Sequence, residues 1–368
     1  MPNIKRGMMG ASGSSSAGSQ LWAWGTNNYG KLGTGNETHY SSPVQVGGLA
    51  TWAYIAHRDL SGFAINSDYT LWSWGYNNAG QLGHGNTTSI SSPGQVGSLT
   101  DWSKVWTGEG GHSTAAVKTD GTLWTWGSNA YVQLGLGDNT DRSSPVQVGA
   151  LTNWSTVAVG QSHMLAIKTD GTLWGWGRAD YGALGSGSEA AQSSPIQIGA
   201  LTNWLQVTAL GNIASAAVKT DGTLWSWGFA HAGCTGLGNT TKYSSPVQVG
   251  SLTDWAQVSG RSFSCGAVKT DGTLWSWGKN NSGQLGIGDK TDRSSPCQVG
   301  ALTTWSKVQL GHGHFAALKT DGTIWGAGVA AGMGNSDSVT NHCSPVQAGA
   351  ESDWTDLRCG RSAVIALK

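Results

Sequence analysis

Charged and imidazole side chains recur along this chain, each time shortly after a Trp-x-x-Val motif and usually next to a glycine. Such side chains can bind anions, hydrogen-bond to a partner or, in the case of histidine, ligate a metal. Because the motif is repeated along the chain, we expect these side chains to meet around one centre. The candidate partner-binding residues are Arg58, Glu109, His112, His163, Arg261, His314 and Arg361.

The same positions offer little for catalysis or metal binding. His312 and His314 are expected to share one face of a strand and could ligate a metal, but the sequence marks no third ligand. No spacing indicates a nucleophile with its base, a phosphate-binding loop or paired carboxylates. The five cysteines occupy no fixed repeat position and form no Cys-x-x-Cys motif. We therefore predict a protein that is not an enzyme and that holds neither a cofactor nor a metal.

The elements that must position these residues are found in a repeat. The segment KTDGTLWSWG, residues 269–278, has close copies along the whole chain. Seven copies align on the Leu or Ile before the first tryptophan, at positions 21, 71, 123, 173, 224, 274 and 324. The period is therefore about 50 residues, which is typical of propeller and solenoid architectures.

Each repeat predicts four short strands. LWSWG and PVQVG alternate between their two faces, and two further apolar runs, such as WSKVQLG and HFAALK, complete the repeat. The Asp-Gly pair before LWSWG predicts a hairpin turn in which both residues have positive φ. Helical periodicity is absent from the sequence. The predicted unit is a four-stranded antiparallel blade, and the fold class is all-β.

Seven blades predict a closed ring over residues 20–368. A blade cannot bury both faces alone, so the paired tryptophans of LWxWG are expected to pack on the next blade. A third tryptophan in each repeat should add to this contact. QLWAWG, residues 20–25, and SAVIALK, residues 362–368, each lack the other half of a hairpin. We expect these two segments to pair and close the seven-bladed β-propeller.

The repeat resembles that of the regulator of chromosome condensation family. The resemblance is carried by WGKNNSGQLGIGDKTDRSSPCQVG, residues 277–300, and by VAVGQSHMLAIKTDGTLWGWG, residues 157–177. It implies a seven-bladed propeller. The family includes an exchange factor for a small GTPase that uses an inserted β-wedge, and a plant ultraviolet-B photoreceptor with extra tryptophans. The short repeat spacing leaves no room for the wedge. The repeat style is most similar to bacterial and phage members.

Composition limits the partners that we expect. Charged residues make up 11% of the chain and the net charge is zero, which argues against nucleic acid and membrane insertion. A protein or a surface glycan is the predicted partner. Residues 1–19 form a predicted Gly/Ser-rich arm. Its residues Lys5, Arg6, Met8 and Met9 are expected to join the protein to a larger assembly.

These observations lead to a ranked set of functions. The first is a non-enzymatic interaction or structural propeller, as a phage virion component associated with the tail or capsid, or as a surface-binding module. The alternative is an exchange-factor-like regulator of a small GTPase, and a hydrolase at the channel mouth is the weakest. The first 20 residues contain no secretory signal. The predicted location is the virion or the extracellular space after lysis, with the cytoplasm as the alternative.

Overall fold

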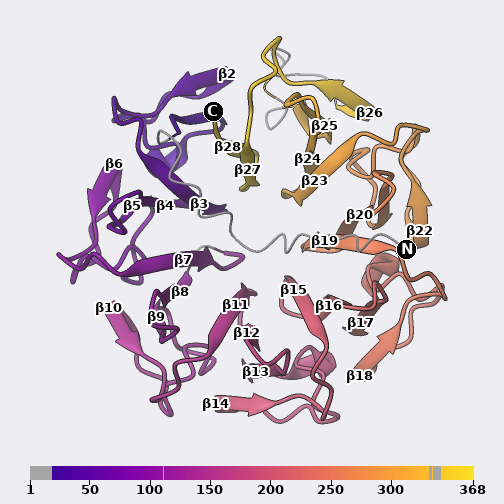
Figure 1. Cartoon of the computed structure of the whole chain (residues 1–368), viewed down its shortest axis with the longest axis horizontal. Helices are drawn as coiled ribbons and strands as arrows, with labels where there is room; N and C mark the ends of the chain where they lie inside the picture. Colours follow the sequence, from indigo (N-terminus) through magenta and orange to yellow (C-terminus); the bar gives the residue numbers. More distant parts are fainter. Residues whose placement is uncertain (1–18, 111, 331–333, 335–340) are drawn as a thin grey trace, which may run out of the picture.

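Seven four-stranded antiparallel sheets surround a central channel in the computed structural model (Figure 1), which describes residues 19–110, 112–330, 334 and 341–368. The prediction of an all-β, seven-bladed propeller is confirmed. The predicted arm residues Lys5, Arg6, Met8 and Met9 lie outside the described residues, so the arm stays a prediction. Within the described part of the chain, no helix is both long enough and apolar enough to cross a membrane.

The blades are numbered here around the ring, and the strands of each are given from the channel outward. Blade 1 contains β3 (Trp52–Arg58), β4 (Ser61–Asn66), β5 (Leu71–Gly75) and β6 (Ile90–Gln95). Blade 2 contains β7 (Trp102–Thr107), β8 (Ser113–Lys118), β9 (Leu123–Gly127) and β10 (Arg142–Gln147). Blade 3 contains β11 (Trp154–Val159), β12 (His163–Lys168), β13 (Leu173–Gly177) and β14 (Gln192–Gln197). Blade 4 contains β15 (Trp204–Leu210), β16 (Ala214–Lys219), β17 (Leu224–Gly228) and β18 (Tyr243–Gln248). Blade 5 contains β19 (Trp255–Arg261), β20 (Ser264–Lys269), β21 (Leu274–Gly278) and β22 (Arg293–Gln298). Blade 6 contains β23 (Trp305–Leu310), β24 (His314–Lys319), β25 (Ile324–Gly328) and β26 (His342–Gln347). Blade 7 contains β27 (Asp356–Cys359), β28 (Ala363–Leu367), β1 (Leu21–Gly25) and β2 (Tyr40–Gln45).

Blade 7 closes the ring as the sequence predicts. Strand β1 pairs with β28 in antiparallel register, from Leu21 opposite Leu367 to Gly25 opposite Ala363. The two outer strands of this blade thus come from the first fifty residues and the two inner strands from the last fifteen. Because every strand pairs within its blade, this closure leaves no blade incomplete.

The second and third strands of blades 2 to 6 are joined by the Lys-Thr-Asp-Gly-Thr turn. In blade 2, Asp120 Oδ1 accepts hydrogen bonds from the Thr122 backbone N–H at 2.9 Å and from its hydroxyl at 2.7 Å. Thr122 Oγ1 in turn accepts one from Trp124 Nε1 at 3.0 Å, and the Lys118 ammonium lies 4.3 Å from the Trp124 ring centroid. The repeated segment therefore forms one connected set of interactions, in which lysine, aspartate, threonine and tryptophan contact one another.

The prediction of positive φ at both turn residues is wrong. Only the glycine has it, with φ 80° at Gly121, where an added Cβ would lie 2.1 Å from the Thr152 carbonyl oxygen. The Gly121 N–H donates to the Lys118 carbonyl at 3.0 Å. This pattern fits a type I turn followed by a bulged glycine, in which the aspartate keeps ordinary backbone angles.

The tryptophans of the repeat, three in every blade except blade 6, form the contact between blades. In blade 1, Trp74 is fully buried against Leu21 and Ala23 of blade 7, and its Nε1 donates to the Lys31 carbonyl at 2.9 Å. Trp72 is half-buried and meets Trp52 edge-on at 6.0 Å. The packing role is thus confirmed, but the tryptophans face the preceding blade rather than the next one.

Candidate functional site

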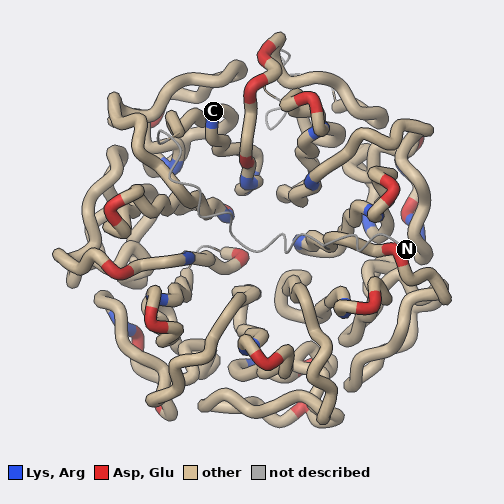
Figure 2. The backbone as a smooth tube through the Cα atoms, viewed as in Figure 1, with Lys and Arg blue, Asp and Glu red and all other residues tan. Residues whose placement is uncertain are grey.

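The innermost strands of all blades run toward the same end of the channel, which we call the network face; the opposite side, where the Lys-Thr-Asp-Gly-Thr turns lie, is the turn face. Figure 2 shows positively and negatively charged segments at these inner strand ends. In blades 1 and 5 the strand is followed by a non-glycine residue with left-handed backbone, Asp59 with φ 47° and Ser262 with φ 50°. The predicted residues therefore reach the channel mouth from tight turns.

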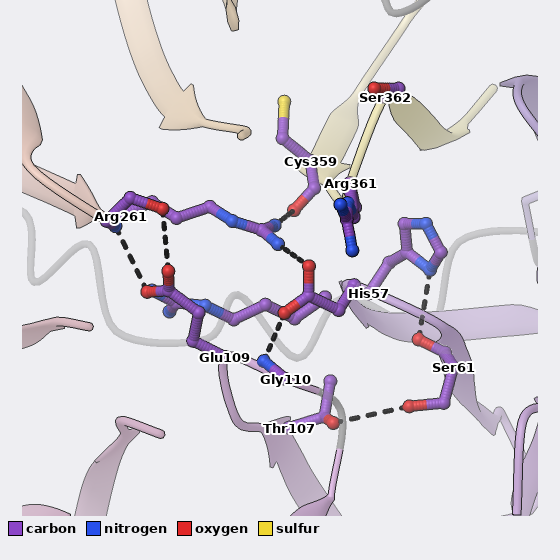
Figure 3. Close-up of polar contacts among 12 residues, drawn as sticks. His57, Ser61, Thr107, Glu109, Gly110, Arg261, Cys359, Arg361 and Ser362 are labelled. Carbon is purple, nitrogen blue, oxygen red and sulfur yellow. Dashed lines mark hydrogen bonds and ion pairs between the residues drawn. The ribbon is translucent and has the colours of Figure 1, made fainter. Parts of the chain in front are cut away.

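A buried ion pair crosses the channel mouth. Arg261 of blade 5, with no exposed surface, pairs through Nη2 with Asp59 Oδ1 of blade 1, and its Nη1 donates to the Cys359 carbonyl of blade 7 at 3.4 Å (Figure 3). The Gly110 N–H of blade 2 donates to the other Asp59 oxygen. Burial alone would raise the pKa of Asp59, but Arg261 and the Gly110 amide hold it below its usual value. Asp59 therefore remains an anion.

A second ion pair lies beside the first. Arg58 Nη2 is 3.6 Å from Glu109 Oε2 and donates to the Ala209 and Gly260 carbonyls at 3.1 and 3.0 Å. Glu109 accepts hydrogen bonds from the Ser262 hydroxyl at 2.6 Å and its backbone N–H at 3.0 Å. Together the two pairs, the channel network, join blades 1, 2, 4, 5 and 7 across the axis.

Three of the predicted partner-binding residues are buried in the structure. Arg58, Glu109 and Arg261 do meet, but Arg261 is fully buried and therefore cannot contact a partner directly. His163 and His314 also have no exposed surface, so neither can touch a partner directly. The reason is that each opens the second strand of its blade, which lies inside the sheet. Their predicted role in partner binding is not tested by these contacts.

The remaining predicted residues are accessible. Arg361 is exposed in the turn between β27 and β28. His112 is half-buried and lies edge-on to Tyr76 at 6.4 Å. The expected shared face of His312 and His314 is wrong, because His312 lies outside strand β24 and is exposed whereas His314 is buried. The described residues contain no group of three or more His, Cys, Asp or Glu that could hold a metal.

Sequence reasoning missed Lys31. Its side chain is 1% exposed, and its Nζ donates to the Arg361 carbonyl at 2.5 Å and to Thr26 Oγ1 at 2.8 Å. The pKa of Lys31 is lowered to about 8, mainly by burial; the charge of Asp59 opposes this shift, and those of Arg261 and Arg361 add to it. A sequence signal existed, because a lysine stands here where the repeat usually has glutamine in Gly-Gln-Leu-Gly.

That exchange also changes the shape of the surrounding loop. In blades 1, 2 and 5 the glutamine Oε1 accepts the backbone N–H two residues earlier, as Gln81 does from Ala79 at 2.9 Å. Where Lys31, Ala183 or Cys234 replaces it, the loop forms a 3-10 turn instead. These turns are η1 (Asn28–Gly30), η2 (Asp180–Gly182) and η3 (His231–Gly233). Loss of one amide side chain thus produces a second loop conformation.

These loops expose tyrosines on the network face. Tyr29 is 46% exposed, Tyr131 48% and Tyr181 42%. Tyr29 and Tyr181 both have φ 62°, which is uncommon for a bulky residue. Each tyrosine rests on a side chain of the following blade. The ring centroids of Tyr29 and Tyr76 are 4.5 Å apart, and those of Tyr181 and Phe229 are 5.6 Å apart. The Arg178 guanidinium carbon lies 5.0 Å from the ring centroid of Tyr131.

Comparison with solved structures shows the same architecture. The crystal structure of Prp20p from Saccharomyces cerevisiae superposes with a TM-score of 0.84 at 17% identity, covering 96% of this chain and 92% of that one. Human WBSCR16 superposes with a TM-score of 0.83 at 19% identity, covering 95% and 98%. At these identities the likeness shows the fold alone.

Sequence comparison identifies more specific relatives. Ultraviolet-B receptor UVR8 of Arabidopsis thaliana is 33% identical over 240 residues, 64% of this chain and 54% of that protein. The mitochondrial RCC1 domain-containing protein RUG3 of the same plant is 30% identical over 151 residues, 39% of this chain and 34% of RUG3. The chain thus spans about half of UVR8 and a third of RUG3. These plant relatives do not support the predicted bacterial or phage-type membership.

Family models settle the membership itself. The model of the RCC1-like domain matches residues 15–267, and that of the regulator of chromosome condensation (RCC1) repeat matches residues 271–318. The first match alone covers more than half of the sequence. The chain belongs to the family of RCC1-like domains.

Proposed function

We propose that this protein is a non-enzymatic propeller that binds another protein on its network face. The observation that carries the proposal is the set of exposed tyrosines Tyr29, Tyr131 and Tyr181 on loops of that face. Tyrosine is enriched in protein interfaces, because it offers a large contact area with few rotatable bonds. Each ring is already supported by a neighbouring side chain, so little ordering is needed when a partner binds.

The turn face also exposes apolar side chains: one tyrosine, Tyr69 in the turn of blade 1, and otherwise leucines. Six leucines, each 44 to 49% exposed, precede the first strands of blades 1 to 6 at equivalent positions: Leu49, Leu99, Leu151, Leu201, Leu252 and Leu302. Because the same leucine recurs in six blades, the repeat itself can account for its presence without a partner. A partner without sevenfold symmetry can be recognised more specifically by the network face, because the exposed residues there differ from blade to blade.

The channel mouth supports binding of a macromolecule rather than a small substrate. The channel network places two ion pairs across it, whereas small-molecule sites are concave and mostly apolar. Among structural neighbours, the Prp20p structure is described with binding to Gsp1p and histones, and yeast RCC1 (Prp20) was solved bound to Kap60. Proteins with this fold are thus described as binding other proteins, which supports a protein partner here.

The test compares the two faces with matched variants of the full chain. Tyr29→Ser with Tyr181→Ser removes two exposed rings from the network face, and Leu99→Ser with Leu201→Ser removes two exposed side chains from the turn face. Proteins captured from an extract of the native host cell are quantified by mass spectrometry. We expect at least tenfold loss with the tyrosine variant and retention with the leucine variant. The reverse pattern would assign binding to the turn face.

An exchange-factor-like regulator is the second candidate, favoured by the similarity in fold to Prp20p over nearly the whole chain. Against it, each of the seven described sheets has four strands, and none carries an additional hairpin. A nucleotide-release assay with a panel of small GTPases tests this candidate. A virion role and the predicted location have no support from the named relatives. The genes next to this one in its genome would test both.

A further inference from the structure

Positive charge exceeds negative charge at the channel mouth. Arg58 and Arg261 pair with Glu109 and Asp59, which leaves Arg361 and Lys31. Within the described part of the chain, Arg361 forms no ion pair, and no dashed contact reaches its side chain in Figure 3. The Lys31 ammonium donates to neutral oxygens, those of the Arg361 carbonyl and the Thr26 hydroxyl.

The buried Lys31 is unusual because a buried ammonium is normally paired with a carboxylate. Among the described residues Lys31 forms no ion pair. The carboxylate of Asp59, which is paired with Arg261, raises its pKa from a distance, whereas the guanidinium groups of Arg261 and Arg361 lower it. Two like charges held close together, one of them buried, create a positive potential that a bound anion would relieve. A buried group with a shifted pKa beside an accessible cation is typical of a binding site.

The Arg361 turn is held in place before any partner arrives. Lys31 and Thr26 both donate to the Arg361 carbonyl, at 2.5 and 3.3 Å. The Thr26 N–H donates to the Ser362 carbonyl at 2.8 Å, and Ser362 has φ 50°. The backbone that carries the exposed guanidinium is therefore fixed by three hydrogen bonds from the loop that follows β1 in blade 7. That same loop, residues 26–31, presents Tyr29 beside Tyr76.

We propose that this sector of the network face, formed by Arg361, Lys31, Tyr29 and Tyr76, binds a carboxylate side chain of a partner protein. The inference rests on the proposed function and names the partner's chemistry. Arg361 makes a charge-assisted hydrogen bond to the carboxylate, and the positive charge of the buried Lys31 attracts it electrostatically. The rings of Tyr29 and Tyr76 contact apolar atoms of the same partner segment.

Charge and composition favour this occupant over two others. A nucleic acid needs a broad basic surface, whereas this chain has a net charge of zero. Residues 1–18 of the chain itself contain Lys5 and Arg6 and no acidic residue, so their charge does not complement the sector. An acidic segment of another protein fits both the small number of cations and the adjacent aromatic pair.

The test uses a randomised library of 12-residue peptides as the probe, selected at low salt on the full-length protein. The decisive variant is Arg361→Gln. Its matched control is Arg293→Gln, which removes the same charge from an arginine already paired with Asp289 at 2.5 Å. We expect the wild type and the control to enrich Asp and Glu in the selected peptides. Arg361→Gln should lose that enrichment and bind the selected peptides at least tenfold more weakly.

The other outcomes separate the two proposals. If the wild type selects peptides without acidic enrichment, or if Arg361→Gln binds acidic peptides as tightly as the control does, the carboxylate site is refuted while protein binding stands. If no peptide is retained at all, the carboxylate site is also refuted, because a fixed guanidinium should hold acidic peptides at low salt. The face comparison with tyrosine and leucine variants remains the separate test of the proposed function.

Discussion

The two ends of the propeller are built on different principles. The turn face repeats one device of lysine, aspartate, threonine and tryptophan in five blades, with a close variant, Asp68-Tyr69-Thr70, in blade 1. At the network face, residues that differ in every blade form one set of contacts across the axis. A device used many times can lose one copy, whereas the channel network exists once. The repeated residues therefore specify the fold, and the unrepeated ones connect distant blades and face the partner.

Acid should produce the largest effect, and it should act at the network end. Burial lowers the pKa of His57 and His314 to about 3 and that of His163 to about 4, with positive neighbours adding to each shift. The unfolded chain binds these protons below about pH 6.5. Folding stability is therefore complete above pH 6.5 and falls as the pH decreases. The slope should reach about 4 kcal/mol per pH unit if all three histidines contribute.

Urea unfolding at pH 7, 6 and 5 measures this slope. Replacing His163 by glutamine should reduce it, and the control His231→Gln, at an exposed loop position, should not. Hydrogen exchange at pH 5 should show the network ends of the strands opening before the turn face. A stability that does not change between pH 7 and 5 would contradict the buried, neutral state of these imidazoles.

Breaking the channel network should have the next largest effect. Arg261→Ala leaves Asp59 buried without its partner, which should lower the free energy of unfolding by about 3–5 kcal/mol. The double variant Arg261→Leu with Asp59→Leu should be less destabilised than Arg261→Ala, because no charge is left unpaired. Urea unfolding of the three proteins makes the comparison. Equal loss in the single and double variants would show that the pair acts through its shape rather than its charge.

Blade 6 offers a test of the repeated core. Ala327 stands where the repeat has its second tryptophan, and the residue opposite it on the neighbouring strand is Phe315, fully buried. In blade 5 the same pair is Cys265 and Trp277. Phe315→Cys should cost about 2–4 kcal/mol through the cavity it leaves. Adding Ala327→Trp should recover most of this loss, and thermal unfolding would show whether it does.

A single turn should contribute the least. Asp271→Ala in blade 5 removes the acceptor of two Thr273 hydrogen bonds, at 2.9 and 2.7 Å, and should cost about 1 kcal/mol. The same change at Asp120 should add to it, because the blades are separate. A loss as large as that of Arg261→Ala would remove the distinction between the two ends of the molecule.

The sequence predicts the repeated part of the molecule well and the network poorly. Seven copies of one pattern determine the strands, the packing role of the tryptophans and the pairing of β1 with β28, although not which neighbouring blade the tryptophans face. Asp59 and Lys31 carry no such signal, because their partners come from other blades and depend on how the ring brings strand ends together. Burial of Arg261 could not be predicted for the same reason. An arginine at a loop position is normally exposed, and here an aspartate 202 positions away neutralises it.

The most direct test of the proposed binding face is oxidative footprinting of the protein alone and with the partner that it captures. Hydroxyl radicals modify exposed tyrosines and leucines, so both faces report in one experiment. We expect protection of Tyr29, Tyr131 and Tyr181 on the network face and unchanged modification of Leu99, Leu201 and Leu302 on the turn face. Protection of the leucines with unchanged tyrosines would contradict the assignment of partner binding to the network face.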